Sequence, residues 1–485
     1  MENNHYHRNQ NPHVLMMAYP LQGHVIPFVN LALKLASYGF TITFINTDSI
    51  HQQITKARQP TNADDGEDIF AEARKSDLDI RYTTVSDGFP LLFDRSLNHD
   101  QFMEGLLHDF SAHADELVGR LVNSHPEISC LITDTFYVWS SVIANKYNLV
   151  SISFWTEPAL VLTLYYHLDL LRSHGHFDSA DNREDAIDYI PGVRSLKPKD
   201  MMSYLQAKDT STVVHRIIYK AFADVKRVDF IICNTVQELE SETISALHEK
   251  QPTYAIGPIF PPGFTKGVVA TSLWSESECT QWLGNKPRGS VLYASFGSYA
   301  HCSKNDIMEI ATGLLLSEVS FIWVLRPDIV SSDEHDFLPV GFKENIKDRG
   351  LIVTWCSQID VISHPAIGGF FTHCGWNSIL ESIWCSLPLL CFPLLTDQFT
   401  NRKLVVDDWR IGINLCDKKS ITKEEVSDKV NGLMSGKPGD EARKNVKEVR
   451  KILENAISSD GSSEKNFTRF IDDVKMKIVK RCGPA

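Results

Sequence analysis

Short apolar runs alternate along the chain with longer stretches in which apolar residues recur every three to four positions. In the first half the apolar runs are HVLMMA, FTITFIN, CLITD and LVSISFW, which read as buried strands. A helix is predicted from about Pro27 to Tyr38, because Phe28, Leu31 and Leu35 fall on one of its faces. Gly39 just past its end is a stop signal. Strands alternating with helices are the pattern of parallel α/β sheets.

The same alternation begins again after residue 285. Its apolar runs are SVLYASFGS, SFIWVL, LIVTW, GGFFTHCG and LPLLCFP. Between the halves lies YAIGPIFPPGFTKG, whose glycines and prolines are typical of an interdomain linker. The pattern predicts an α/β protein made of two doubly wound halves that face each other. We assign 1–254 to the first domain, 255–275 to the linker, 276–460 to the second domain and 461–485 to a C-terminal helix.

Composition narrows the class of protein. The chain has 485 residues, too many for one hydrophobic core, and its net charge of −13 argues against a nucleic-acid partner. Its longest apolar stretch is interrupted by Glu157, Pro158 and Asp169, so stable membrane insertion is not expected. Ten cysteines are scattered along the chain, and the N-terminus lacks the apolar core of a signal peptide. We therefore expect reduced thiols and a cytoplasmic location.

Doubly wound folds bind ligands beyond the carboxyl ends of their strands. The residues that follow predicted strands are candidates on that rule alone. In the first half they are His24, Asp134 and Thr156, and in the second half Ser298, Trp355, His373 and the triplet Thr396, Asp397 and Gln398. We expect these positions to meet at the cleft between the two domains.

Residues 370–382 read FFTHCGWNSILES, a strand-like run followed by small polar residues and a helix-like run. Gly375 lets the backbone approach a ligand, and the first N–H groups of the following helix form an anion site. His373, Asn377 and Ser378 add side-chain donors suited to phosphate oxygens. The stretch therefore predicts a phosphate-binding turn.

Two further side chains extend this site. Glu381 lies one helical turn after Ser378, where its carboxylate could accept bonds from sugar hydroxyls, and Trp355 offers a flat surface for a base. Taken singly, a histidine after a strand or a lone tryptophan is more often structural. Their joint spacing favours a nucleotide diphosphate that carries a sugar.

The 44 residues from Trp355 to Gln398 resemble, in length and landmarks, the signature box of the plant secondary-product UDP-glycosyltransferases. PLQGHVIPFVNLALKLASYG, ASFGS and FIWVLRP resemble other segments of that family, so the similarity covers nearly the whole chain. Ser386 departs from the box, where glycine is usual. The resemblance implies the GT-B fold, with two Rossmann-like domains across a cleft and a final helix that crosses back to the first domain.

The family's functional residues carry over to matching positions of this chain. By resemblance, Trp355 and the Cys356 backbone would contact uracil, and Gln358 and Glu381 would bind ribose. The diphosphate would be held by His373, Asn377, Ser378 and Ser298. The transferred sugar would be contacted by Thr156, Trp376, Asp397 and Gln398. His24 would be the catalytic base and Asp134 its partner. The dipole of the helix that follows His24 is expected to help keep its imidazole neutral near pH 7.

The resemblance implies an inverting, metal-independent transfer of glucose from UDP-glucose to a hydroxyl or carboxyl of a small hydrophobic acceptor, giving a β-glucoside. One base and no second carboxylate nucleophile at the sugar predict a single displacement. In this family Gln at the last box position, here Gln398, goes with glucose. The acceptor pocket would come from loops such as VSDGFPLLFDRS and the segment around Tyr165. We expect a monomer whose partners are the UDP-sugar and the acceptor, with no metal and no cofactor.

Other classes fit the sequence less well. The G-x-G-x-x-G of a dinucleotide oxidoreductase and the G-x-S-x-G of a serine hydrolase are missing from the expected places. Asp77 and Asp79 lie in a polar run that enters a strand, which favours a solvated turn over a metal site. The cysteines and histidines of the box match no usual zinc spacing. The alternative from another class is a UDP-sugar-binding scaffold or sensor that has lost catalysis.

Overall fold

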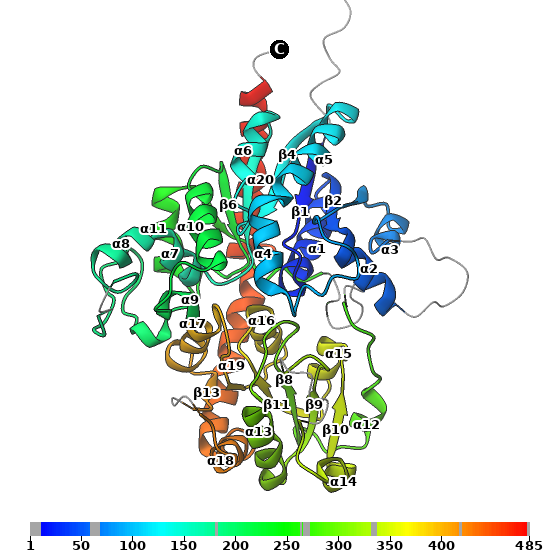
Figure 1. Ribbon diagram of the computed structural model, residues 1–485, viewed down its shortest axis with the longest axis vertical. Coiled ribbons are helices and arrows are strands. Elements are labelled where there is room, and N and C mark those ends of the chain that lie inside the picture. The colour runs from blue at the N-terminus through cyan, green and yellow to red at the C-terminus, as the bar shows by residue number, and fades with distance from the viewer. Residues whose placement is uncertain are drawn as a thin grey trace, which may run out of the picture.

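The computed structural model describes residues 11–58, 68–179, 183–261, 264, 272–330, 337–416 and 420–482. Its two sheets lie one above the other, each with helices packed on it (Figure 1). The first has the strand order β3-β2-β1-β4-β5-β6-β7 and the second β10-β9-β8-β11-β12-β13. All of their strand pairs are parallel. The predicted fold class, α/β with two doubly wound GT-B domains, is confirmed.

The strands are short and mostly buried on both faces, as expected where helices cover both sides of a parallel sheet. The first sheet comprises β1 His13–Met17, β2 Thr41–Thr47, β3 Ile80–Val85, β4 Ile128–Asp134, β5 Val150–Trp155, β6 Phe230–Cys233 and β7 Thr253–Ala255. The second comprises β8 Val291–Ser295, β9 Ser320–Val324, β10 Gly350–Val353, β11 Ile367–Thr372, β12 Leu389–Cys391 and β13 Gly412–Asn414.

Helices connect these strands and cover the sheets. Those of the first half are α1 Gln22–Ser37, α2 Asp48–Ala57, α3 Ala71–Lys75, α4 His99–His108, α5 Phe110–Ser124, α6 Ser140–Lys146, α7 Ala159–Tyr166, α8 Leu168–Ser173, α9 Ser203–Gln206, α10 Val213–Val225 and α11 Ser241–Lys250. Those of the second half are α12 Thr280–Gly284, α13 Lys304–Ser317, α14 Phe342–Ile346, α15 Gln358–Ile362, α16 Trp376–Trp384, α17 Gln398–Lys403, α18 Lys423–Met434, α19 Lys437–Ala456 and α20 Ser462–Cys482. Within the described residues, no helix has the length and apolar character needed to cross a bilayer.

The strand orders explain where a ligand can enter. The first sheet changes its winding direction between β1 and β4, and the second between β8 and β11. Because the connections leave such a switch point in opposite directions, a crevice opens at the carboxyl ends of its two strands. His24 follows β1, Asp134 ends β4, Ser298 follows β8 and His373 follows β11. The candidates chosen from the sequence therefore stand at both switch points.

Helix α1 begins earlier than its sequence predicts. It starts at Gln22 rather than near Pro27, so His24 lies within its first turn and Pro27 lies inside the helix. Proline has no N–H to donate to the carbonyl four residues earlier, which is that of Gly23. This carbonyl instead accepts the side-chain amide of Asn377 at 2.8 Å. Pro27, at which the helix was expected to start, thus leaves the Gly23 carbonyl available as an acceptor for the other domain.

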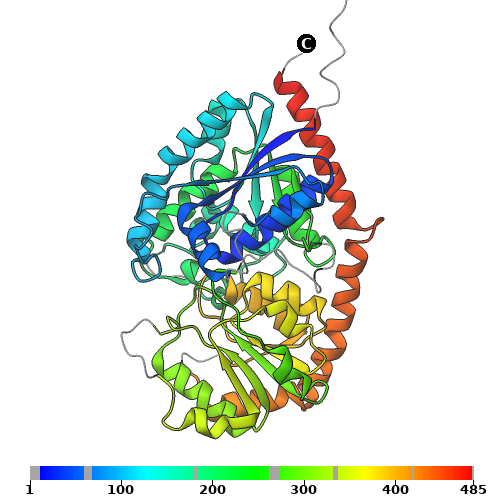
Figure 2. The same cartoon turned by 90° about the vertical axis from the view of Figure 1, so that its right-hand side faces the viewer.

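The final two helices run along one side of the whole molecule (Figure 2). α19 packs in the second half, and α20 reaches the first half, where Tyr254 donates to Asp473 and Arg481 bonds Asp229 at 2.7 Å. Phe467 packs in the core of the first sheet. Part of the predicted linker, residues 262, 263 and 265–271, lies outside the described residues.

Candidate active site

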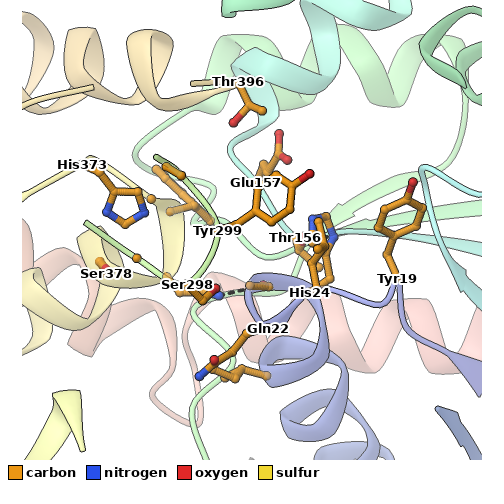
Figure 3. Close-up of a pocket in the computed structure, with 18 of the residues that line it drawn as sticks. Tyr19, Gln22, His24, Thr156, Glu157, Ser298, Tyr299, His373, Ser378 and Thr396 are labelled. Atoms are coloured by element: carbon orange, nitrogen blue, oxygen red, sulfur yellow. Dashed lines mark hydrogen bonds between the residues drawn. The ribbon is translucent and has the colours of Figure 1, made fainter. Parts of the chain in front are cut away.

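A cavity of about 860 Å³ lies between the carboxyl ends of the two sheets. Its walls come from both halves of the chain (Figure 3). Every predicted donor-site residue lines it, namely Thr156, Ser298, Trp355, Cys356, Gln358, His373, Trp376, Asn377, Ser378, Glu381, Asp397 and Gln398. His24 also lines it, whereas Asp134 lies behind His24 and is 1% exposed. One cavity therefore gathers side chains that are up to several hundred residues apart.

His24 and Asp134 form a hydrogen-bonded pair at the first switch point. His24 Nδ1 lies 2.7 Å from Asp134 Oδ2 and 3.2 Å from Thr156 Oγ1. An ionised carboxylate only accepts hydrogen bonds, so this contact favours the tautomer with the proton on Nδ1. The lone pair is then on Nε2. The pair has the geometry of a base and the group that orients it.

The pKa of His24 is shifted upward, against the direction expected from the helix dipole. Burial alone would lower the pKa of His24, but the charge and hydrogen bond of Asp134, together with the charge of Asp397, outweigh it and raise the pKa above its ordinary value. The helix dipole was expected to lower this pKa, whereas the net shift in the structure is upward. Asp134 and Asp397 stabilise the imidazolium more than burial opposes it.

At one end of the cavity, Gln358, Ser378 and Glu381 form a hydrogen-bonded network. Gln358 Nε2 donates to Ser378 Oγ at 3.0 Å and to Glu381 Oε2 at 2.7 Å. Burial raises the pKa of Glu381 to about 7, while the bond from Gln358 opposes the shift. Gln358 is the first residue of α15, and the other two lie on α16, so two helices hold this network in place.

Trp355 stands beside this network with an aromatic neighbour that was not selected from the sequence. The ring of Trp274 lies roughly parallel to it, with centroids 6.4 Å apart and planes inclined by 28°. The backbone N–H of Ser277 donates to the Trp355 carbonyl at 2.9 Å, which fixes the two segments against each other. Trp274 lines the cavity as well. A large aromatic residue among polar neighbours at the end of the predicted linker was the available signal.

His373 is packed tightly at the second switch point. A Cβ at Gly297 would lie 2.4 Å from His373 Nε2, and one at Gly375 would lie 2.6 Å from it, so only glycine fits at both positions. Gly297 also has φ +75°, which disfavours other residues. Burial and the positive charge of Arg326 lower the pKa of His373 to about 4. The ring is therefore neutral near pH 7.

Arg326 is a buried residue that the sequence analysis did not select. It is 1% exposed and bonds the carbonyls of Gly297 and Ala300, the second at 2.8 Å, and Asp328 at 2.9 Å. These bonds hold the turn after β8 that presents Ser298 to the cavity. The guanidinium group thus shapes the turn and adds positive charge beside His373.

The Thr396–Gln398 segment forms the opposite end of the site. The sequence analysis placed Asp397 and Gln398 just after a strand, but β12 ends at Cys391, and Asp397 is instead the N-cap of α17. Gln398 Oε1 accepts from the backbone N–H groups of residues 394 and 395 at 2.8 and 2.9 Å. Burial raises the pKa of Asp397, which accepts bonds from Thr396 and Asn401.

Side chains of the donor half also bond the first domain. Trp376 Nε1 donates to the Asn234 carbonyl at 2.8 Å. The Thr396 N–H donates to the Ser203 hydroxyl at 2.9 Å, and the Ser203 N–H donates to the Thr396 carbonyl at 3.0 Å. These bonds of Trp376 and Thr396, together with the bond from Asn377 to the Gly23 carbonyl, hold the two domains together around the cavity. Ser386, where the family usually has glycine, has φ +58° and does not line the cavity.

The apolar wall of the cavity differs in part from the prediction. Tyr165 lines it, as expected, but no residue of the loop 85–96 does. That loop is held by Arg95, which bonds Asp87, and the following helix α4 supplies His99 and Met103 instead. Charge patterning gave no sign that the loop would be tied down in this way. The remaining apolar lining comes mainly from Phe136, Tyr204, Val214, Ile217 and Ile218.

Glu157 is a further lining residue that the sequence analysis mentioned only as an interruption of an apolar stretch. It follows Thr156 directly after β5, and its Oε2 atom is buried without a hydrogen-bond partner among the described residues. A charged residue inside the longest apolar run was the signal that could have identified it. Among the described residues, no three His, Cys, Asp or Glu side chains are grouped so as to hold a metal ion.

Comparison with known proteins identifies the family. The model of the family described as "UDP-glucoronosyl and UDP-glucosyl transferase" matches residues 199–452. UDP-glycosyltransferase 86A1 of Arabidopsis thaliana is 65% identical, over 98% of this chain and 97% of its own. The 7-deoxyloganetin glucosyltransferase of Gardenia jasminoides is 34% identical, over 95% and 97%. The structure of Phytolacca americana UGT2 with UDP-2fluoro-glucose and pterostilbene superimposes with a TM-score of 0.77 at 27% identity, over 96% of this chain and 100% of the other. The chain therefore belongs to the plant UDP-glycosyltransferases and is an enzyme of that family.

Proposed function

We propose that this enzyme transfers glucose from UDP-glucose to a hydroxyl group of a small apolar acceptor, with inversion at the anomeric carbon. The observation that carries the proposal is the His24–Asp134 pair, 2.7 Å apart, at the cavity that the donor-site residues line from the other domain. This arrangement allows a base from one domain to act on a donor held by the other. The proposed product is a β-glucoside.

In the proposed reaction, His24 removes the proton from the acceptor hydroxyl while its oxygen attacks the anomeric carbon. Asp134 fixes the ring and stabilises the imidazolium that forms, as the raised pKa of His24 indicates. UDP leaves with its added negative charge facing the N-terminus of α16 and the side chains of His373, Ser298 and Ser378. Trp355, Gln358 and Glu381 are proposed to hold the uridine, with the Cys356 backbone at the edge of uracil. Thr156, Trp376, Asn377, Asp397 and Gln398 complete the site as the family resemblance implies.

A single displacement is proposed because the carboxyl groups near the sugar site are poor nucleophiles. Asp397 accepts bonds from Thr396 and Asn401, and its pKa is raised by burial. Burial and the charges of Asp397 and Asp134 raise the pKa of Glu157 well above its usual range. A carboxyl that is protonated or already bonded attacks carbon weakly, which favours direct attack by the acceptor.

The acceptor is proposed to be a hydroxylated apolar compound. The cavity wall supplied by α4, α7 and α10 is rich in aromatic and aliphatic side chains, and the structure of Phytolacca americana UGT2 contains pterostilbene. An inactive UDP-sugar-binding scaffold is the second candidate, and the intact His24–Asp134 geometry argues against it. We further propose a cytoplasmic monomer, consistent with the nine free cysteines among the described residues.

UDP-glucose is expected to be the preferred donor, and the product is expected to be β-linked. The measurement is UDP release across a library of phenols and alcohols, with UDP-glucose, UDP-galactose, UDP-glucuronate and UDP-xylose in competition, followed by NMR of the product. Gln398 and Asp397 suit the adjacent hydroxyls of a neutral hexose. Preference for one of the other three donors would refute the glucose assignment, and an α-linked product would refute inversion. UDP-glucose binding without any transfer would support the scaffold instead.

Transfer is expected to keep its rate in the presence of EDTA. The groups proposed to receive the charge of the leaving UDP are the α16 N-terminus and uncharged side-chain donors, and no metal-binding cluster occurs among the described residues. The assay compares initial rates before and after chelation, and again after adding Mg²⁺ or Mn²⁺. A rate that collapses in EDTA and returns with either cation would contradict the proposal.

A further inference from the structure

Glu157 places a carboxyl group at the wall of the cavity without an evident structural partner. It lies at the bend between β5 and α7, and its buried Oε2 atom has no hydrogen-bond partner in the part of the chain that the structure describes. Figure 3 shows its side chain among those of the pocket, with Thr156 and Thr396 also labelled there. A buried polar atom without a partner costs free energy, so its presence at a cavity points to a ligand that bonds it.

The neighbouring Glu240 shows what a structural carboxylate looks like in this part of the fold. Glu240 is buried and accepts the first backbone N–H groups of α7, those of Ala159 and Leu160, at 2.9 and 2.8 Å, as well as the Thr235 hydroxyl. It therefore uses the first N–H donors of the helix that follows Glu157. Glu157 is left beside the helix N-terminus without capping it, so helix stability does not explain this residue.

The charges around Glu157 are mainly negative. Burial raises its pKa most, and the charges of Asp397 and Asp134 raise it further, which favours the protonated carboxyl. The titratable side chains that line or adjoin this part of the cavity are Asp134, His24, Tyr165, Tyr299 and Asp397. Among the described lining residues Arg58 is the only arginine and lysine is absent, and Arg58 lies just past α2 rather than near β5. A protonated carboxyl is a hydrogen-bond donor.

We propose that Glu157 is a specificity-determining residue of the sugar subsite, where its carboxyl group donates a hydrogen bond to a hydroxyl oxygen of the transferred hexose. This inference rests on the proposed function and extends it. Glu157 lines the same cavity as Thr156, Asp397 and Gln398, the residues proposed to contact the sugar, and it directly follows Thr156 in the chain. The hexose would supply the partner that the buried oxygen lacks.

The test compares binding of UDP-glucose with binding of UDP by calorimetry in the unmodified enzyme and in the Glu157→Ala and Glu157→Gln variants. Glu157→Ala is expected to weaken UDP-glucose about three- to tenfold, the worth of one hydrogen bond, and to leave UDP unchanged because UDP has no hexose. Glu157→Gln keeps an N–H donor and is expected to bind UDP-glucose within about threefold of the unmodified enzyme at neutral pH. Asp169→Asn, which changes a carboxylate that is 84% exposed, is the matched control and is expected to change neither affinity.

The pH dependence separates recognition from a merely structural role. As pH rises through its raised pKa, Glu157 loses the proton it donates, so UDP-glucose affinity is expected to fall on the alkaline side in the unmodified enzyme. Glu157→Gln should not show this loss of UDP-glucose affinity. Titration of Glu381 affects both proteins equally, so the difference between their pH profiles reports on Glu157. Equal weakening of UDP and UDP-glucose, or a loss confined to the acceptor KM, would overturn the inference. Because binding needs no turnover, this result is independent of whether transfer is observed.

Discussion

Replacing His24 with alanine is expected to lower the rate of transfer by about 10²–10⁴-fold, the usual worth of general-base catalysis. The affinity for UDP should stay unchanged, because the groups proposed to hold UDP belong to the other domain. His24 has a hydrogen-bonded partner at 2.7 Å and lines the cavity, as a base must. Turnover and UDP binding, measured on the same preparation, check both parts of this prediction.

The pH profile supplies the control for His24. The Asp134 charge raises the pKa of His24, and only the neutral ring can take a proton, so the rate should fall as pH falls through that raised pKa. Asp134→Asn removes the charge, and burial then lowers the pKa, so the acid limb should move to lower pH. Full turnover in His24→Ala, or UDP affinity lost along with the rate, would show that His24 is not the base.

Replacing Glu381 with alanine is expected to weaken UDP binding rather than the catalytic rate, the opposite of the result expected for His24→Ala. A hydrogen bond to a charged group contributes about 1.5–3 kcal/mol, which corresponds to about 10- to 150-fold in Kd. UDP affinity should fall by that factor, whereas kcat at saturating donor should change little. The Gln358 bond at 2.7 Å already holds the carboxylate in the orientation proposed for ribose. Glu448→Ala, which removes an exposed carboxylate of α19, is the control and should bind UDP normally.

The binding contribution of Glu381 should depend on pH near neutrality. Burial raises its pKa to about 7, and the ionised form is the better acceptor, so affinity should weaken as pH falls below about 7. UDP-glucose is the appropriate probe, because its diphosphate has no proton that titrates in this range. Glu381→Gln should flatten this part of the profile. A profile of Glu381→Gln that still weakens below pH 7 would assign the titration to another group.

The architecture could be predicted because parallel strands that are buried on both faces consist of short continuous apolar runs. The sequence analysis did not identify β3, β6, β7 or β13 by name, and the last three are only three or four residues long. The predicted start of α1 at Pro27 was wrong because proline is common in a first turn, and here the helix continues around it. Edges and starts of elements depend on tertiary contacts that local sequence does not encode.

The site was predictable where residues follow strands in a recognisable spacing. The sequence analysis missed Trp274, Arg326 and Glu157 for the same reason. The role of each depends on contacts with residues that only the folded chain brings close to it. Trp274 matters because its ring lies against that of Trp355, 81 positions later. Arg326 matters because it binds carbonyls of a turn 26 to 29 positions earlier. Glu157 becomes conspicuous only once Glu240 is seen to take the nearby helix donors.

The bond between Asn377 and Gly23 has a consequence for building hybrid enzymes from this family. Pro27 has no N–H to pair with the Gly23 carbonyl, and Asn377 of the donor half supplies the missing bond. A donor half taken from a relative would therefore dock well only if it also placed a side-chain amide at the position of Asn377. Without that amide, the Gly23 carbonyl would lie at the domain interface without a hydrogen-bond partner. The Gly23 carbonyl lies one residue before His24, so a poorly matched seam would also shift the base relative to the sugar. Exchange of halves is therefore expected to preserve activity when Pro27 and Asn377 are transferred or retained as a pair.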